Sequence, residues 1–139
     1  MELEKAKKLL EGGKYTCVLC CGDEVYTSTL RGVAPLLAWL DSGELPKGFS
    51  AADKAVGKAP ACIYALLGAK AVYANIMTTA AIEIFDRCGI KHECALEVPV
   101  IRNRANTDFC PVELAVKECT ELWDVVEAAR KCLSEMNKK

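Results

Sequence analysis

The first dozen residues alternate apolar and charged positions with the period of a helix. The apolar positions fall on one face, Lys and Glu separate them, and two glycines at 12–13 end the pattern. We therefore predict a short amphipathic helix over residues 2–12, whose apolar face needs a sheet or another helix to cover it. The residues of this face are Leu3, Ala6, Leu9 and Leu10.

The next segment has the pattern of β-structure. Residues 15–20 are apolar and β-prone, Gly22-Asp23 follows them, and residues 25–27 are β-prone again. Two such runs around a short turn predict a tight hairpin. The sheet therefore opens with two antiparallel strands.

A helix is predicted to follow the hairpin. It begins near Val33, places Pro35 in its first turn, and ends at Ser42-Gly43. Proline is favoured in the first turn of a helix because the amide that it lacks has no partner there. A loop over residues 43–48 comes next.

A second helix is predicted from Ala51 to about Leu67. Ser50 and Asp53 have the spacing of a helix-capping pair, and Gly68 ends the pattern. Pro60 falls inside this helix, where it removes one backbone hydrogen bond, so we expect a kink or a break at that position.

The second half of the chain predicts a strand over residues 71–76, a helix over 79–88 and a strand over 91–98. A strand, a helix and a strand of these lengths imply a parallel pair of strands. A polar loop over 102–108 follows, Pro111 suits a further helix, and a last helix restarts at Thr120-Glu121. The chain is therefore predicted to be an α/β protein.

Length and charge limit the classes of function. The chain has 139 residues, enough for a single domain over 1–139, and its 18 basic and 19 acidic residues give a net charge of −1. This balance predicts no nucleic-acid partner. No secretory signal starts the chain and no apolar run approaches the length that spans a bilayer, so we expect a cytoplasmic protein with no membrane partner.

Nine cysteines are an unusually high number. In a reducing compartment we interpret them as small buried hydrophobic residues. Cys17 and Cys20 have a C-x-x-C spacing, but they fall in a predicted strand where they face opposite ways, and no second close pair follows. The sequence therefore predicts no metal site.

Two other side chains are candidates for chemistry. His92 is the only histidine and is structural unless Cys110 lies beside it in space. Cys110 precedes Pro111 at a predicted helix start, and Arg102 and Arg104 come shortly before it, so positive potential favours its thiolate. The alternative is that Cys110 is simply a small residue before a helix.

The predicted helix start after Ser50 has the parts of an anion site. It offers helix amides, small residues that allow close approach, and Lys54 and Lys58 one turn apart. The glycine spacing before Lys58 is not that of a Walker loop, and no cofactor is expected. The alternative is a capped helix with two solvated lysines.

Three segments of the chain resemble the uncharacterised DUF1893 family. They are Tyr-Thr-Cys-Val-Leu at 15–19 with Tyr-Thr-Ser at 26–28, then Gly-Phe-Ser-Ala-Ala-Asp-Lys-Ala-Val-Gly-Lys-Ala at 48–59, and Cys-Pro-Val-Glu at 110–113. The resemblance implies a cytidine-deaminase-like fold: one three-layer domain with a mixed sheet flanked by helices. True zinc deaminases open two helices with their metal ligands and a catalytic Glu. The helix openings predicted here at Ser50 and Thr78 offer no such ligands.

The resemblance also implies that the helix after Ser50 begins where a deaminase has its pocket. We therefore expect a metal-free protein that binds a small anionic or nucleotide-like ligand at this helix start. In an enzyme, Asp53 or Cys110 would be the proton acceptor or nucleophile, and Lys54 or Lys58 would stabilise charge. The expected ligand-binding residues are Ser50, Asp53, Lys54, Lys58, Thr78, Arg102 and Arg104, with Cys110 as a further wall residue.

Two other functions stay open from the sequence. One is a non-catalytic interaction module that forms a homo-oligomer or binds another protein through a hairpin edge or through Trp39 and Trp123. The other is a thiol redox sensor that uses Cys110.

Overall fold

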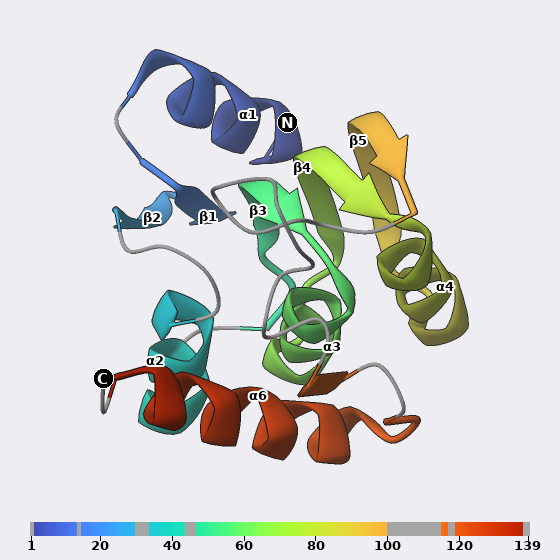
Figure 1. The fold of residues 1–139 in the computed structure, drawn as a ribbon. Helices are drawn as coiled ribbons and strands as arrows, with labels where there is room; N and C mark the ends of the chain where they lie inside the picture. Colours follow the sequence, from blue (N-terminus) through green and yellow to red (C-terminus); the bar gives the residue numbers. More distant parts are fainter. Residues whose placement is uncertain are drawn as a thin grey trace.

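The computed structural model describes residues 2–13, 15–29, 34–43, 47–99, 115–116 and 119–137. Five strands form one mixed sheet in the order β2-β1-β3-β4-β5, and helices cover both of its faces (Figure 1). The strands are β1 (Cys17–Cys21), β2 (Glu24–Ser28), β3 (Ser50–Val56), β4 (Ala71–Thr78) and β5 (Lys91–Val98). The helices are α1 (Glu2–Gly12), α2 (Ala34–Ser42), α3 (Lys58–Leu67), α4 (Thr79–Cys88) and α6 (Leu122–Asn137).

The two faces of the sheet have separate cores. On one face α1 buries Ala6 and Leu10 against Val18, Ala52 and Tyr73. The other face contacts α2, α3, α4 and α6 and forms the larger core. Alternate residues of the strands supply the two cores, as strand geometry requires. The result is three layers with the sheet in the middle, which confirms the α/β fold predicted from the sequence.

The segment from Ser50 to Val56 is a strand, so the helix predicted to begin at Ala51 is wrong. β3 lies in the centre of the sheet, antiparallel to β1 and parallel to β4. Its small, alanine-rich sequence favours a helix locally, but pairing along both edges outweighs that propensity. Alanines also leave room for helices on both faces of the strand.

α3 therefore begins seven residues later than the predicted helix, at Lys58, with Gly57 before it. This start places Pro60 in the first turn, where a missing amide costs no hydrogen bond. The kink predicted at Pro60 is wrong for the same reason.

Most of the other predicted elements are confirmed. α1, α4 and β5 have the predicted bounds, the hairpin turns at Gly22-Asp23, and β4 and β5 run parallel. β4 extends two residues further than predicted, to Thr78. The loop at 102–108 and the helix predicted at Pro111 lie outside the described residues. Among the described helices, none is long and apolar enough to cross a membrane.

Two glycines at helix ends give a test of this backbone. Gly89 ends α4 in the left-handed region at φ 70°, and a Cβ there would meet no atom within 4 Å. Gly89→Ala should therefore lower the free energy of unfolding by about 1 kcal/mol through backbone strain alone. Urea unfolding measures this change.

Gly12 is the matched control, because a Cβ there is equally unobstructed and its φ is not positive. Gly12→Ala should leave stability unchanged or raise it by a few tenths of a kcal/mol, up to about 1 kcal/mol. Equal losses in the two variants would contradict the left-handed end of α4.

Candidate functional site

Two helices begin side by side at the carboxyl ends of the parallel strands β3 and β4. Val56, the last residue of β3, pairs with Met77 near the end of the parallel strand β4. α3 and α4 follow these strands directly, so their N-termini lie at the same edge (Figure 1). The positive ends of two helix dipoles therefore meet there. In open α/β sheets, ligands bind at the carboxyl ends of parallel strands.

Thr78 caps the start of α4. Its side chain is 2% exposed, and its Oγ1 accepts a hydrogen bond from the amide of Ala81 at 3.1 Å. This cap satisfies an amide that the helix itself leaves unpaired. Thr78, which was predicted as a wall residue, therefore lies at the start of α4 and holds the first turn of that helix.

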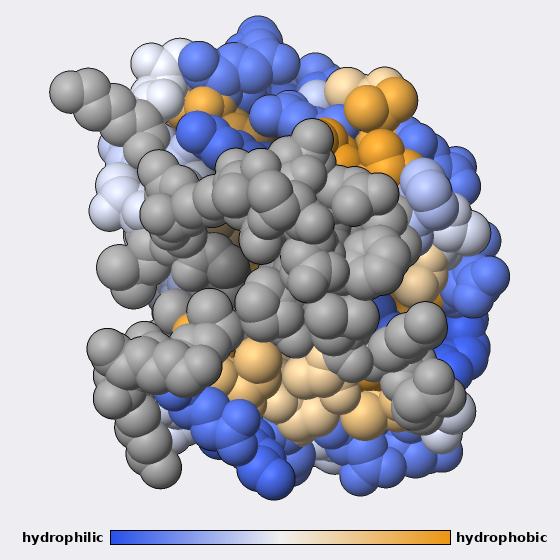
Figure 2. Space-filling model, viewed as in Figure 1, coloured by the Kyte–Doolittle hydropathy of each residue, from blue (hydrophilic) through white to orange (hydrophobic). Residues whose placement is uncertain are grey.

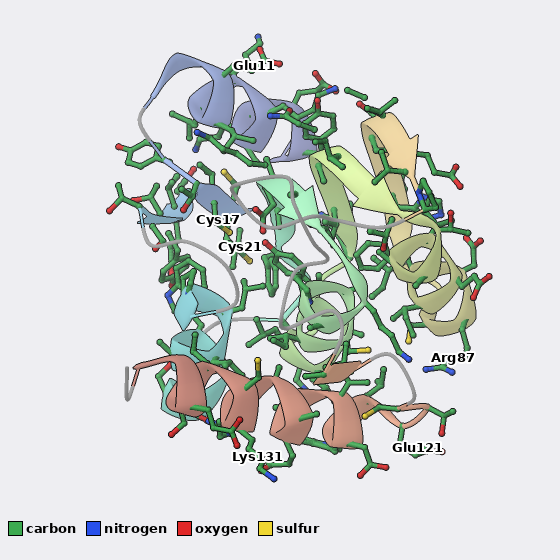
Figure 3. The ribbon with its side chains drawn as sticks, in the orientation of Figure 1. Glu11, Cys17, Cys21, Arg87, Glu121 and Lys131 are labelled. Atoms are coloured by element: carbon green, nitrogen blue, oxygen red, sulfur yellow. The ribbon has the colours of Figure 1, made fainter. Side chains whose placement is uncertain are left out.

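Lys58 lies at the start of α3 and reaches toward the chain before α6. Its Nζ donates a hydrogen bond to the backbone oxygen of Cys119. Arg87 of α4 donates in the same way to the oxygen of Thr120 at 3.4 Å (Figure 3). Lys58 at the start of α3 and Arg87 in the last turn of α4 thus hold the segment before α6 against these two helices.

The predicted grouping of Ser50 with Lys54 and Lys58 on one helix start is wrong. Ser50 is buried at the opposite end of β3, paired with Cys20 and Ala71. The six residues 51–56 separate it from Gly57, which is about 23 Å along the strand at 3.3 Å per residue. Lys54 is exposed within the strand, so it does not share a helix face with Lys58.

Asp53 belongs to a hydrogen-bonded chain of three side chains. Its Oδ2 accepts a hydrogen bond from the hydroxyl of Tyr64 at 2.7 Å, and its Oδ1 accepts one from the amide of Lys54 at 2.8 Å. The same hydroxyl lies 3.0 Å from Sγ of Cys17. Cys17 is directly opposite Asp53 in the β1–β3 register, on the side of the sheet that it shares with Cys21 (Figure 3).

Burial dominates the electrostatics of this chain. Desolvation raises the pKa of Asp53 from 3.8 to about 6, although the hydrogen bonds from Tyr64 and the backbone oppose the rise. Burial also raises the pKa of Tyr64 and of the Cys17 thiol well above their usual ranges, so both stay protonated at neutral pH. Of these three side chains, only Asp53 titrates near neutral pH, as a proton acceptor requires.

The first turns of α3 and α4 do not fit a zinc site. They hold Lys58, Ala59 and Pro60 in one helix and Thr79 and Ala80 in the other. None of these side chains ligates zinc in proteins. Over the described ranges, no group of three His, Cys, Asp or Glu side chains could hold a metal ion. Cys17 and Cys20 face opposite sides of the sheet, as predicted.

Comparison with known proteins gives a family but no activity. The family model described as a domain of unknown function, DUF1893, matches residues 5–133. The chain belongs to the DUF1893 family. A solved structure of a DUF1893 family protein from Thermotoga maritima matches with a TM-score of 0.84 and 20% identity, over 96% of this chain and 89% of that chain. That likeness shows the fold. No curated protein matches this chain.

His92 has structural partners in this DUF1893 chain. Its ring stacks on Phe85 with centroids 6.0 Å apart, and its Nε2 lies 2.8 Å from a carboxylate oxygen of Asp86. Both partners belong to α4, so the histidine fastens β5 to that helix. Arg102, Arg104 and Cys110 lie outside the described residues, and their predicted roles stay predictions.

The two tryptophans differ in their surroundings. Trp39 on α2 is half-buried and packs against the larger core, whereas Trp123 on α6 is 56% exposed. Only Trp123 presents the surface that an interaction module would use.

Two of the three side chains in the hydrogen-bonded group around Asp53 could not be predicted from the sequence. Cys17 and Tyr64 meet Asp53 only through the register of β1 and β3 and the position of α3. The one usable signal was Pro60, since a proline in a first turn places the helix start near Lys58 and leaves residues 50–56 for a strand.

The raised pKa of Asp53 predicts a pH dependence of stability in this family member. Between the unfolded pKa of about 4 and the folded pKa of about 6, the native state binds the Asp53 proton more tightly than the unfolded chain does. The contribution of Asp53 to the free energy of unfolding therefore falls as pH rises through this window and is constant above it. The fall is at most about 3 kcal/mol, and less because part of Asp53 is accessible to solvent.

Asp53→Asn should remove this fall, which urea unfolding at about pH 4, 5, 6 and 7 measures. Asp23→Asn, in the exposed hairpin turn, is the matched control and should keep the wild-type slope. A D53N profile parallel to the wild-type profile would show that Asp53 does not titrate as described.

Tyr64→Phe should destabilise the protein by about 1–3 kcal/mol at neutral pH, because it removes the donor that faces the Asp53 carboxylate. The loss should be smaller at about pH 4, where the carboxyl is neutral and accepts more weakly. Tyr26→Phe is the control, since its hydroxyl donates to Glu24 at the exposed hairpin. Equal losses in the two variants at neutral pH would refute a special role for the buried pair.

Proposed function

We propose that this protein binds a small anionic or nucleotide-like ligand, without a metal, at the carboxyl ends of β3 and β4, where α3 and α4 begin. The observation that carries the proposal is the register of β3 and β4, which brings the two helix N-termini together. Adjacent helix N-termini supply amide groups and positive potential, which favour phosphate and carboxylate groups. The proposal moves the ligand from Ser50 to the other end of β3.

The residues around this edge suit an anion. Lys58 adds a positive charge at the first residue of α3, and Gly57 adds no side chain that would obstruct the approach of a ligand. Thr78 fixes the first turn of α4 and thus the direction of its amides. Arg102 and Arg104 remain proposed wall residues from the sequence.

Asp53 extends the proposal toward catalysis. It lies three residues before the end of β3, and Tyr64 and the Lys54 amide hold its carboxylate in one orientation. A carboxyl with a pKa of about 6 accepts a proton at neutral pH and can return it. We propose Asp53 as the proton acceptor of any reaction at this site, with Cys110 as the alternative from the sequence.

The cytidine-deaminase-like character of the fold belongs to the same proposal. The mixed sheet, the flanking helices and the order of the elements support it. In zinc deaminases, helix starts present the metal ligands. We propose that the starts of α3 and α4 correspond to these helix starts; because their side chains do not ligate a metal, the proposed ligand would bind there without one.

A thermal-shift screen of nucleotides, sugar phosphates and carboxylate metabolites tests the binding. A ligand at 100 times its Kd should stabilise the protein by about 2.7 kcal/mol. Lys58→Met should weaken the binding of such a ligand by about tenfold, because a charge-assisted contact is lost.

Lys54→Met is the matched control, since Lys54 is exposed and lies on the face of β3 that Ala52 presents to α1. An equal loss of affinity in K54M and K58M would contradict the location, and the absence of any stabilising ligand would contradict the function. Stoichiometric zinc in the purified protein would refute the metal-free part of the proposal.

A further inference from the structure

β5 is an unusually exposed edge of the sheet. Among the described strands it is the last in the order, it has eight residues, and not one of them is buried. Leu96 is 56% exposed, and its register neighbour on β4, Ile76, is 37% exposed. Hydrophobic residues gather on the surface over this end of the sheet (Figure 2). A long exposed edge with apolar side chains is a template for pairing with another strand.

A second copy of β5 can pair with the first only in certain registers. Along a strand the amide and carbonyl of successive residues point to opposite edges, so every second residue of β5 points away from β4. In an antiparallel pair of identical strands, outward residues must face outward residues. The two-fold axis must therefore pass through a residue of β5 and not between two residues.

Charge and the length of the pairing together select one of these registers, because axes through His92 or Leu96 pair only three or five residues of each strand. An axis through Glu93 places the two Glu93 side chains opposite each other, and an axis through Ala95 places Glu93 opposite Glu97. Like charges directly opposite destabilise a strand pair. An axis through Cys94 instead places Lys91 opposite Glu97 of the partner subunit, and the two-fold symmetry repeats this pair on the other side of the axis. This register pairs seven residues of each strand.

The same register also covers the apolar side chains. Leu96 comes opposite His92 of the partner subunit, whose ring stacks on the partner's Phe85. The two Cys94 side chains face each other across the axis. Glu93 and Glu97 contact Lys7 and Thr79 of their own chain, and a carboxylate has further lone pairs for Lys91 of the partner. No ion pair of the described residues occupies Lys91.

We propose that the protein forms a homodimer by antiparallel pairing of β5 with β5 of a second copy, centred on Cys94, so that the two sheets become one sheet of ten strands. The dimer forms through the edge strand β5 alone and does not depend on the proposed ligand. One strand pair buries little area, so the expected Kd is on the order of micromolar.

Sedimentation equilibrium of the full chain over a range of concentrations tests the dimer. Lys91→Glu and Glu97→Lys should each weaken it by about tenfold or more, since each turns two attractive pairs into repulsive ones. The double variant K91E/E97K restores opposite charges and should return the Kd to near the wild-type value. Val25→Asp, on the opposite edge strand β2, is the control and should leave the dimer intact.

Thiol oxidation with diamide gives an independent readout. Antiparallel opposite residues have the Cα spacing of a disulfide, so Cys94 should cross-link the two chains. Cys94→Ser should abolish the covalent dimer, and Cys88→Ser, which removes an exposed cysteine on α4, should not. A wild-type monomer at high concentration, failure of the double charge swap to restore dimerisation, or dissociation caused by V25D would each overturn the proposal.

Discussion

The position of β3 between β1 and β4 is the constraint on which the rest of the structure depends. β3 joins two different units: the antiparallel hairpin on one side and the parallel β4–β5 unit on the other. It must also accept α1 on one face and α3 on the other, which its small residues allow. Any shift of its register by one residue would exchange the two faces and their cores.

The register of β3 also creates both candidate regions of the site. Toward β1 it sets Asp53 opposite Cys17, and α3 returns along the sheet to bring Tyr64 over this pair. Toward β4 it sets Val56 beside Met77, so that α3 and α4 begin together. A carboxyl that titrates near neutral pH and a pair of helix N-termini thus arise from one strand.

Elements with strong local signals could be predicted from the sequence, and β3 could not. The Gly22-Asp23 turn, the glycine after Cys88 and the apolar period of α1 each depend on residues close in the chain. β3 depends on pairing with strands that lie about 30 residues before it and about 20 after it. Helix propensity therefore dominated the local pattern of residues 50–56, and only Pro60 argued against it.

The positions of the candidate residues could be predicted only in part from the sequence, and for a different reason from the one that the structure gives. Asp53 was chosen as a helix-capping residue, yet it matters as a partly buried strand residue under Tyr64. Lys58 and Thr78 were assigned to one region and do lie at one edge, whereas Ser50 lies at the other end of β3. Cys17 could not be connected to Asp53 without the antiparallel register, because 36 residues separate them in the chain.

The chemistry at position 53 also bears on what the carboxyl is for. An asparagine there would have one side-chain oxygen, so in this geometry it could accept from Tyr64 or from the Lys54 amide, and its NH2 group would face the other donor. The carboxylate satisfies both donors, and the cost is the desolvation that raises the pKa of Asp53. What aspartate adds is a proton that it can accept and release near neutral pH. A perturbed carboxyl with this property is a mark of functional sites as well as of buried networks, and here its partners hold it without a neutralising cation among their described contacts. The two hydrogen bonds of Asp53 thus serve the structure, and its raised pKa is what supports the proposed role as a proton acceptor.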